Sequence, residues 1–238
     1  MRALVAHLRL ELALLARNGE SLLLTLGIPV LLLAFFANVD VLPIDGEPID
    51  FLAPGVLALA IVSTSMVNLA IATGFEREYG VLKRLGATPL GRPRLLAAKT
   101  LSILVVEAVQ IAVLWLVALA LGWDPSLDVA FLLAVVLGTV ACAGLGLVMA
   151  GALKALVVLA AANGLYLVLL LLSGMVIPLD ELPGPVQALS KALPSTALAD
   201  AVRGTLTAGV SVPGRAWVVL ALWAVATPLA ATRWFRWE

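Results

Sequence analysis

Long apolar runs separated by short polar stretches make up most of the chain. About 20 consecutive apolar residues in a helix cross the ~30 Å hydrocarbon layer of a bilayer. The pattern therefore predicts an all-α membrane protein, a single transmembrane domain covering residues 1–238, with six membrane-spanning helices. The first of them is close to the short limit and contains Pro29. The predicted spans are residues 21–37, 51–73, 95–122, 129–152, 155–177 and 215–232.

Two further segments have apolar positions at helical spacing without the length of a span. Residues 1–19 combine leucines with Arg9 and Arg17, which predicts an amphipathic helix lying in the membrane interface. A cleaved signal peptide is the alternative, but the charges continue to Glu20 and no convincing small-residue cleavage site follows. Residues 178–214 are polar with regularly spaced apolar residues, so they predict one or two short helices half-immersed in the outer leaflet.

The most patterned polar stretch is residues 74–99, GFEREYGVLKRLGATPLGRPRLLAAK, which joins spans two and three. It holds six Lys and Arg residues against two acids, Glu76 and Glu78. Its first half predicts a short amphipathic helix at the membrane surface, which Gly86 and Pro89 can end. The apolar positions of this helix are Phe75, Tyr79, Leu82 and Leu85. Such a segment either orients the protein in the membrane or docks another protein, and its length and patterning favour docking.

Composition and charge support a membrane protein and give its orientation. The chain is 63% hydrophobic and 13% charged, with a mean hydropathy of +1.11, which is outside the range of soluble globular domains. Lys and Arg are enriched in cytoplasmic loops. Twelve of the 15 Lys and Arg residues fall on the side of residues 74–94 and of both termini. Both termini and residues 74–94 are therefore predicted to be cytoplasmic.

Motifs for enzymatic chemistry are missing from the sequence. It has no G-x-x-x-x-G-K-[ST] phosphate loop and no H-E-x-x-H motif. The single cysteine, Cys142, and the single histidine, His7, cannot form a zinc cluster or an intramembrane serine protease site. We therefore expect that the chain is not an enzyme and binds neither a cofactor nor a metal itself.

One acidic residue, Glu107, lies well inside a predicted span, with Gln110 one turn further on. An ionised group there costs at least a few kcal/mol, so Glu107 must be paired, protonated or in contact with a wet cavity. Either it lines a translocation path or it forms a structural hydrogen bond to a neighbouring helix, with Asn68 or Asn163 as candidate partners. The candidate path residues are Ser65, Asn68, Glu107 and Gln110.

Two stretches resemble the permease subunit of ABC type-2 exporters of the daunorubicin-resistance type. FEREYGVLKRLGATPLGRPRLLAAK is similar to the family's cytoplasmic segment, with an acidic start, a basic amphipathic helix, a T-P-L turn and a lysine opening span three. SGMVIPLDELPGPVQALSKALPSTALADAVRG is similar to its outer-leaflet segment. The amphipathic helix before span one matches as well, so the resemblance covers nearly the whole chain.

The resemblance implies a half-transporter in the bacterial plasma membrane that exports an amphipathic drug, a lipid or a polysaccharide-type substrate. It would pair with itself or with a sister permease and with two separate ATP-binding subunits, which would hold the ATP and Mg²⁺. Its coupling helix would dock in a groove of the ATPase. The residues implied for that role are Glu76, Arg77, Glu78, Tyr79, Leu82, Lys83, Arg84 and Leu85.

Two other classes of function remain open from the sequence. A proton-coupled secondary transporter would use Glu107 as its carrier, although such folds usually contain repeated halves, and none is evident here. A membrane scaffold that transports nothing is the other alternative. Copurification with an ATPase whose activity responds to this chain would separate both from an ABC permease.

Overall fold

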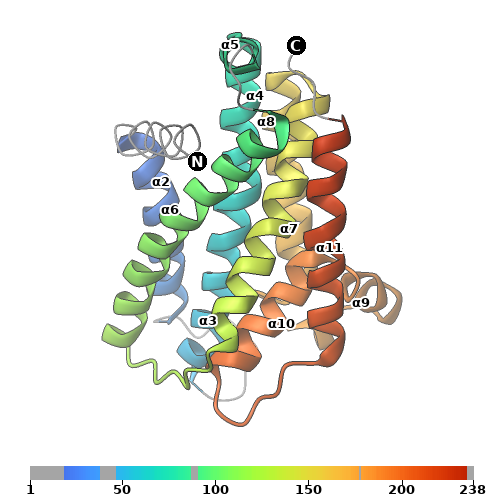
Figure 1. The fold of residues 1–238 in the computed structure, drawn as a ribbon. Helices are drawn as coiled ribbons and strands as arrows, with labels where there is room; N and C mark the ends of the chain where they lie inside the picture. Colours follow the sequence, from blue (N-terminus) through green and yellow to red (C-terminus); the bar gives the residue numbers. More distant parts are fainter. Residues whose placement is uncertain (1–18, 38–46, 87–90, 177, 235–238) are drawn as a thin grey trace.

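A computed structural model describes residues 19–37, 47–86, 91–176 and 178–234 of the chain (Figure 1). Every regular element in this part is a helix, in agreement with the predicted all-α class. The interfacial helix predicted for residues 1–19 lies almost entirely outside the described residues, as does Pro89.

Five helices of the described chain are long and apolar enough to cross a membrane. They are Pro48–Glu78, Pro93–Ala120, Ala130–Ala152, Ala155–Leu172 and Gly214–Trp234. The first predicted span corresponds to helix α2 (Gly19–Ala37), of which Leu26–Ala37 was compared with these five as a shorter apolar helix. The structure thus supports five of the six predicted spans by length and composition.

The second span is the most buried helix of the bundle and contains a local change in helix type. It consists of α3 (Pro48–Val62), a π-helical turn η1 (Ser63–Asn68) and α4 (Leu69–Glu78), which follow one another without a break. The hydroxyl of Ser65 donates a hydrogen bond to the Ile61 carbonyl, 2.5 Å away, which gives a polar side chain a partner inside the bundle. The helix continues beyond residue 73, where the predicted span ends, to Glu78.

Helix α7 (Ala130–Ala152) packs against several neighbours through glycines, as its small residues suggest. A Cβ atom on Gly138 would lie 2.5 Å from the Leu198 side chain, and one on Gly146 would lie 2.6 Å from the Met66 carbonyl oxygen. Gly144 faces Thr227 of α11 (Gly214–Trp234), whose hydroxyl donates to the Ala141 carbonyl at 2.9 Å. These close approaches bring α10, α11 and η1 against one central helix.

Helix α8 (Ala155–Leu172) ends five residues before the predicted end of span five at residue 177. The chain then turns at Gly174, where φ is +72°. It continues through η2 (Leu179–Glu181), α9 (Gly184–Ser190) and α10 (Pro194–Leu206) before α11 begins. Only Ser190 of α9 is buried, whereas ten of the 13 residues of α10 are buried against α3, α7 and α11. α10 is therefore packed within the bundle, whose lower part it crosses in Figure 1, and its half-immersion in the outer leaflet stays a prediction.

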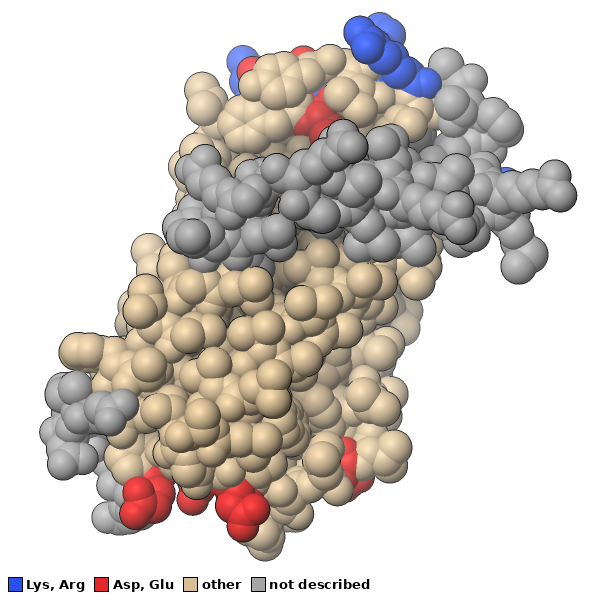
Figure 2. All heavy atoms as spheres, turned by 90° about the vertical axis from the view of Figure 1, so that its left-hand side faces the viewer, with Lys and Arg blue, Asp and Glu red and all other residues tan. Residues whose placement is uncertain are grey.

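The two ends of the bundle differ in charge. One end, which we call the α5 end, carries α5 (Val81–Gly86) and the start of α6 (Arg92–Ala120). The opposite, α10 end carries α10 and the α6–α7 connection. On the face shown in Figure 2, described Lys and Arg side chains lie at the α5 end together with a few acids, whereas the described charges at the α10 end are acidic. This separation agrees with the sorting of charges along the sequence.

Candidate functional site

The predicted coupling helix, Glu76–Leu85, is divided between two helices. Residues 76–78 are the last residues of α4, and α5 starts only at Val81. Between them, Tyr79 leaves the helical conformation and Gly80 adopts φ +71°. No atom lies within 4 Å of a Cβ built on Gly80, so the backbone conformation, and not space, favours glycine there. The turn lets α5 lie at an angle across the end of the bundle (Figure 1).

Leu82 holds α5 on its own chain. Its side chain is 0% exposed and belongs to a cluster of buried residues drawn from α4, α6, α7 and α11. Members of this cluster are Leu69, Leu95, Leu96, Ile103, Ala143, Leu147 and Ala231. We predicted Leu82 as an anchor for another protein, and the structure corrects this, because the side chain is already buried.

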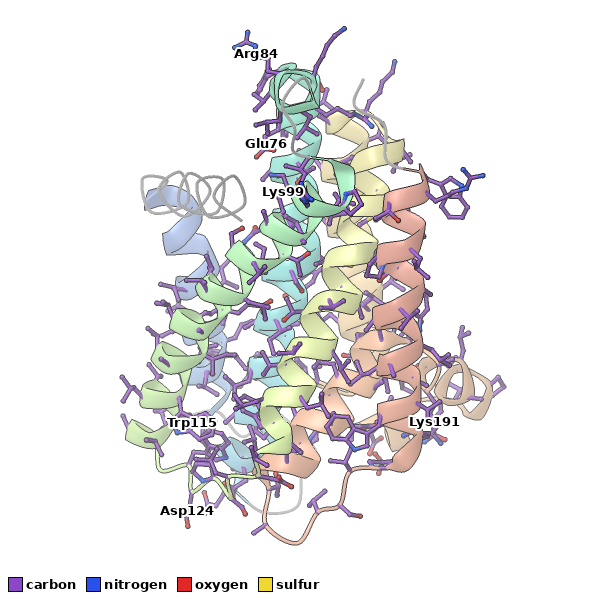
Figure 3. The ribbon with its side chains drawn as sticks, viewed as in Figure 1. Glu76, Arg84, Lys99, Trp115, Asp124 and Lys191 are labelled. Atoms are coloured by element: carbon purple, nitrogen blue, oxygen red, sulfur yellow. The ribbon has the colours of Figure 1, made fainter. Side chains whose placement is uncertain are left out.

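Two polar contacts brace the end of α4. The Glu76 carboxylate and the Lys99 ammonium form an ion pair with an N–O distance of 2.7 Å, which joins α4 to α6 (Figure 3). Lys99 is 1% exposed and Glu76 21%. The Arg77 guanidinium donates a hydrogen bond to the Leu153 carbonyl, at the connection between α7 and α8. Glu76, Arg77 and Leu82 therefore fix the segment to the bundle.

Four of the remaining coupling residues form, together with Val81, a projecting surface that we call the α5 knob: Glu78, Tyr79, Val81, Lys83 and Arg84. All five side chains are exposed, Tyr79 by 71% and Val81 by 39%. The Tyr79 ring stacks on Phe75 with centroids 6.0 Å apart, so it is held although it is exposed. Leu85 is half-buried and packs against the Leu82 cluster. An exposed, held aromatic residue with cations around it is typical of a protein-binding surface.

A groove of about 670 Å³ opens beside the α5 knob, and we call it the α5–α8 groove. One wall comes from the α4–α5 turn and the other from the start of α8. Its lining residues are Arg77, Glu78, Gly80, Lys83, Lys154, Ala155, Leu156 and Val157.

The predicted path residues mostly belong to a buried polar cluster in the middle of the bundle. Thr139 of α7 donates a hydrogen bond to Glu107 Oε2 of α6. Thr64 of η1 donates to Gln110 Oε1 of α6 at 2.9 Å. Ser65 lies close to Glu107 as well, and all of these side chains are no more than 1% exposed. The cluster therefore joins α6 to α7 and to the π-helical turn.

Asn68 also faces a cavity. It is half-buried and lines a separate cavity of about 290 Å³ together with Asn163 and Tyr166. We predicted Asn68 or Asn163 as the partner of Glu107, but the carboxylate accepts its hydrogen bond from Thr139. Asn163 donates to the Leu159 carbonyl of its own helix. A role of Glu107 in translocation stays a prediction.

The sequence was compared with models of known protein families. Residues 2–207 match the model of the ABC-2 type transporter family. The chain belongs to that family. It is a multi-pass membrane protein and the transmembrane permease of an ABC-2 transporter, a membrane component that is not itself the catalytic part. Permeases of this family normally work with an ATP-binding subunit. No curated protein matches the chain.

Family membership does not test the expectation that the chain itself binds neither a metal nor a cofactor. Within the described residues, no group of three or more His, Cys, Asp or Glu side chains could hold a metal ion. The sequence analysis did not identify Lys154, which lines the α5–α8 groove, as a site residue. A single lysine in a short connection forms no motif or spacing that would mark it. Val81 of the α5 knob was missed because it falls between the regularly spaced apolar positions.

Proposed function

We propose that this ABC-2 permease is the membrane half of an ATP-driven exporter of the daunorubicin-resistance type. Its substrate would be an amphipathic drug, a lipid or a polysaccharide-type molecule. Two ATP-binding subunits and a second permease copy, identical or a sister chain, complete the transporter. The α5 end and both termini face the cytoplasm of a bacterial cell, which the uneven distribution of Lys and Arg supports.

The α5 knob is the observation that carries this proposal. It combines the exposed ring of Tyr79, the exposed side chain of Val81 and charged residues on a segment that is braced from beneath. Aromatic anchors surrounded by charges dominate the binding energy of many protein interfaces, while the charges steer association and set the register. The knob therefore suits docking onto the surface of an ATP-binding subunit.

The braces give the docked subunit a mechanical connection to the bundle. The ion pair between Glu76 and Lys99 joins α4, which leads into the knob, to α6. The hydrogen bond from Arg77 joins α4 to the α7–α8 connection. Closure of the ATP-binding subunits would then move α4 and α6 together. ATP and Mg²⁺ act from the partner subunit, and the permease responds as the two-state element.

The test is a double substitution in the knob, Tyr79→Ala with Val81→Ala, compared with a matched pair at the α10 end. Truncating buried anchors of an interface typically costs about 2 kcal/mol or more, which is roughly a thirtyfold loss of affinity. We expect normal insertion and expression, because both side chains are exposed, and loss of ATPase copurification and of export. Lys83→Ala alone should weaken association mildly and in a salt-dependent way.

The control is Leu189→Ala with Val210→Ala, which truncates two apolar side chains exposed by 63% and 44% at the opposite end. It should leave ATPase association unchanged. Copurification of the knob variant at wild-type stoichiometry would contradict the coupling assignment. Loss of association in the control alone would also reverse the proposed orientation, because the ATP-binding subunit is cytoplasmic.

A further inference from the structure

We propose that the α5–α8 groove binds the headgroup of an anionic membrane phospholipid, with an acyl chain lying along the first turns of α8. The proposal concerns a groove that shares Glu78 and Lys83 with the knob but not the exposed Tyr79 and Val81, the residues that would anchor an ATPase. It does not depend on that docking.

The charge of the groove fits a phosphate group. Three cations line it, Arg77 and Lys83 on one wall and Lys154 on the other, against one acid, Glu78. A guanidinium has five N–H donors, so the hydrogen bond from Arg77 to the Leu153 carbonyl fixes its position without using up its donors. Basic pockets between transmembrane helices are characteristic sites for acidic lipid headgroups.

The apolar part of the lining identifies a lipid as the ligand and disfavours an acidic peptide. Leu156 and Val157 are 69% and 48% exposed, and both belong to the first turn of a helix that is long and apolar enough to cross a membrane. The cations therefore lie where α8 enters the membrane, with exposed apolar side chains directly beside them. A phospholipid has the same order of groups, a charged head followed by acyl chains, whereas an acidic peptide would leave the apolar wall uncovered.

The start of α8 adds to the attraction for an anion. Lys154 is the N-cap residue, and the first three residues of the helix line the same groove. The N-terminus of a helix carries partial positive charge that favours phosphate groups. The volume of about 670 Å³ also lies within the range of small-molecule sites.

A bound lipid would add a connection between the turn that carries α5 and the start of α8, beside the hydrogen bond from Arg77 to Leu153. Arg77 and Lys83 lie on either side of the Gly80 turn, and Lys154 lies on the opposite wall. A phosphate held between them would restrict the movement of α5 relative to α8. The occupied groove would thus stiffen the segment that carries the knob.

The experiment titrates the purified full chain, without any ATPase, with phosphatidylglycerol and with phosphatidylcholine of the same acyl chains. Bound lipid is counted by native mass spectrometry. We expect phosphatidylglycerol to bind at least tenfold more tightly than phosphatidylcholine. Lys154→Glu should remove this preference, and Lys154→Arg should keep it. Glu78→Gln, which removes the one acid in the lining, should tighten binding of phosphatidylglycerol.

Three controls make the result specific to the groove. Arg233→Glu changes an exposed cation at the same end of the bundle, outside the groove, and should bind like the wild type. Lys154→Glu should fold normally, because an acidic residue at a helix N-terminus is favourable. The double variant Tyr79→Ala with Val81→Ala should also bind lipid normally, since neither residue lines the groove, so failure of ATPase docking and failure of lipid binding are distinguishable.

Several outcomes would overturn the proposal. Equal affinities for phosphatidylglycerol and phosphatidylcholine would show that the groove does not distinguish headgroups by their charge. Equal losses in Lys154→Glu and Arg233→Glu would show that only the general charge of this end matters. If inorganic phosphate displaces phosphatidylglycerol at concentrations equal to that of the lipid, the groove is an anion site without a role for the acyl chain.

Discussion

The α10 end and the α5 end of the bundle show two ways of attaching a short helix. Ten of the 13 residues of α10 are buried, and small residues such as Ala197, Ala199 and Ala201 let it lie close to α3, α7 and α11. In α5, Leu82 is the one fully buried side chain among those described, and most of its neighbours are exposed. One helix is part of the core, and the other is a surface held at a few points.

Each end also buries a cation, but with different partners. At the α5 end, Lys99 pairs with Glu76. At the α10 end, the Arg203 guanidinium lies 4.1 Å from the centre of the Phe51 ring and donates to the Gly174 carbonyl at 3.1 Å. Burial raises the pKa of Asp200 beside it, which Arg215 and Arg203 oppose. The comparison teaches that the α10 end contributes to stability through many contacts, whereas the α5 end depends on single residues that can be removed one by one.

The largest effect should come from crowding the α10 end with Gly55→Ala. A Cβ atom on Gly55 would overlap the backbone carbonyl of Met175, which cannot rotate away. Overpacking typically costs about 1–3 kcal/mol, and a clash with backbone lies at or above the upper limit. We expect most of the folded protein to be lost, measured as the monodisperse fraction in fluorescence size-exclusion chromatography. Gly27→Ala is the control, since no atom lies within 4 Å of that Cβ; similar yields for both variants would contradict the close packing.

A smaller effect is expected from Lys99→Met at the α5 end. It removes the ion-pair partner of Glu76. Breaking a fully buried pair costs about 3–5 kcal/mol, and we expect about 2 kcal/mol here because Glu76 is partly exposed. Adding Glu76→Gln should restore most of the loss, as measured by thermal unfolding of the four members of the double-mutant cycle. Additive losses in the double variant would mean that the two side chains do not interact.

The smallest global effect should come from Leu82→Ala, although the residue is as buried as Leu198 of α10. Leu198→Ala should lower the global stability by about 2–5 kcal/mol, because it leaves a cavity inside the bundle. Leu82→Ala should lower it by less than about 1 kcal/mol, because α5 can open alone. Hydrogen exchange of residues 81–86 should become much faster in Leu82→Ala while the rest of the bundle keeps its protection. Equal losses of global stability in Leu82→Ala and Leu198→Ala would contradict the proposed difference between the two ends.

Hydropathy depends on local composition, so the sequence could predict the five helices that are long and apolar enough to cross a membrane. The ends of helices were harder to predict from the sequence. The end of α4, which extends to Glu78, is held by the ion pair of Glu76 with Lys99, a contact between distant parts of the chain. The inward side of α5 could not be predicted either. An amphipathic helix packed on its own bundle and one docked on a partner have the same pattern, so Leu82 was assigned to the wrong surface.

The polar residues inside the bundle show the same limit. Glu107 and Gln110 were recognised because acids and amides are rare in spans, but their partners are Thr139 and Thr64. Threonine is common in membrane helices and can bond to its own backbone, so nothing in the sequence marks these two hydroxyl groups as partners. The π-helical turn at residues 63–68 is rich in polar residues, but such residues also occur in regular membrane helices, so the sequence did not predict the change in helix type.

That turn fixes the direction in which the α5 end is aimed. A π-helical turn accommodates an extra residue, and each residue of a helix advances the chain by about 100° around the axis. The extra residue in η1 thus rotates α4 about the helix axis relative to α3, although the two belong to one continuous helix. Without the offset, the face that carries Glu76 toward Lys99 would point roughly a quarter turn away. The direction in which the knob points is therefore set beside Thr64 and Ser65, about three helical turns before Glu76.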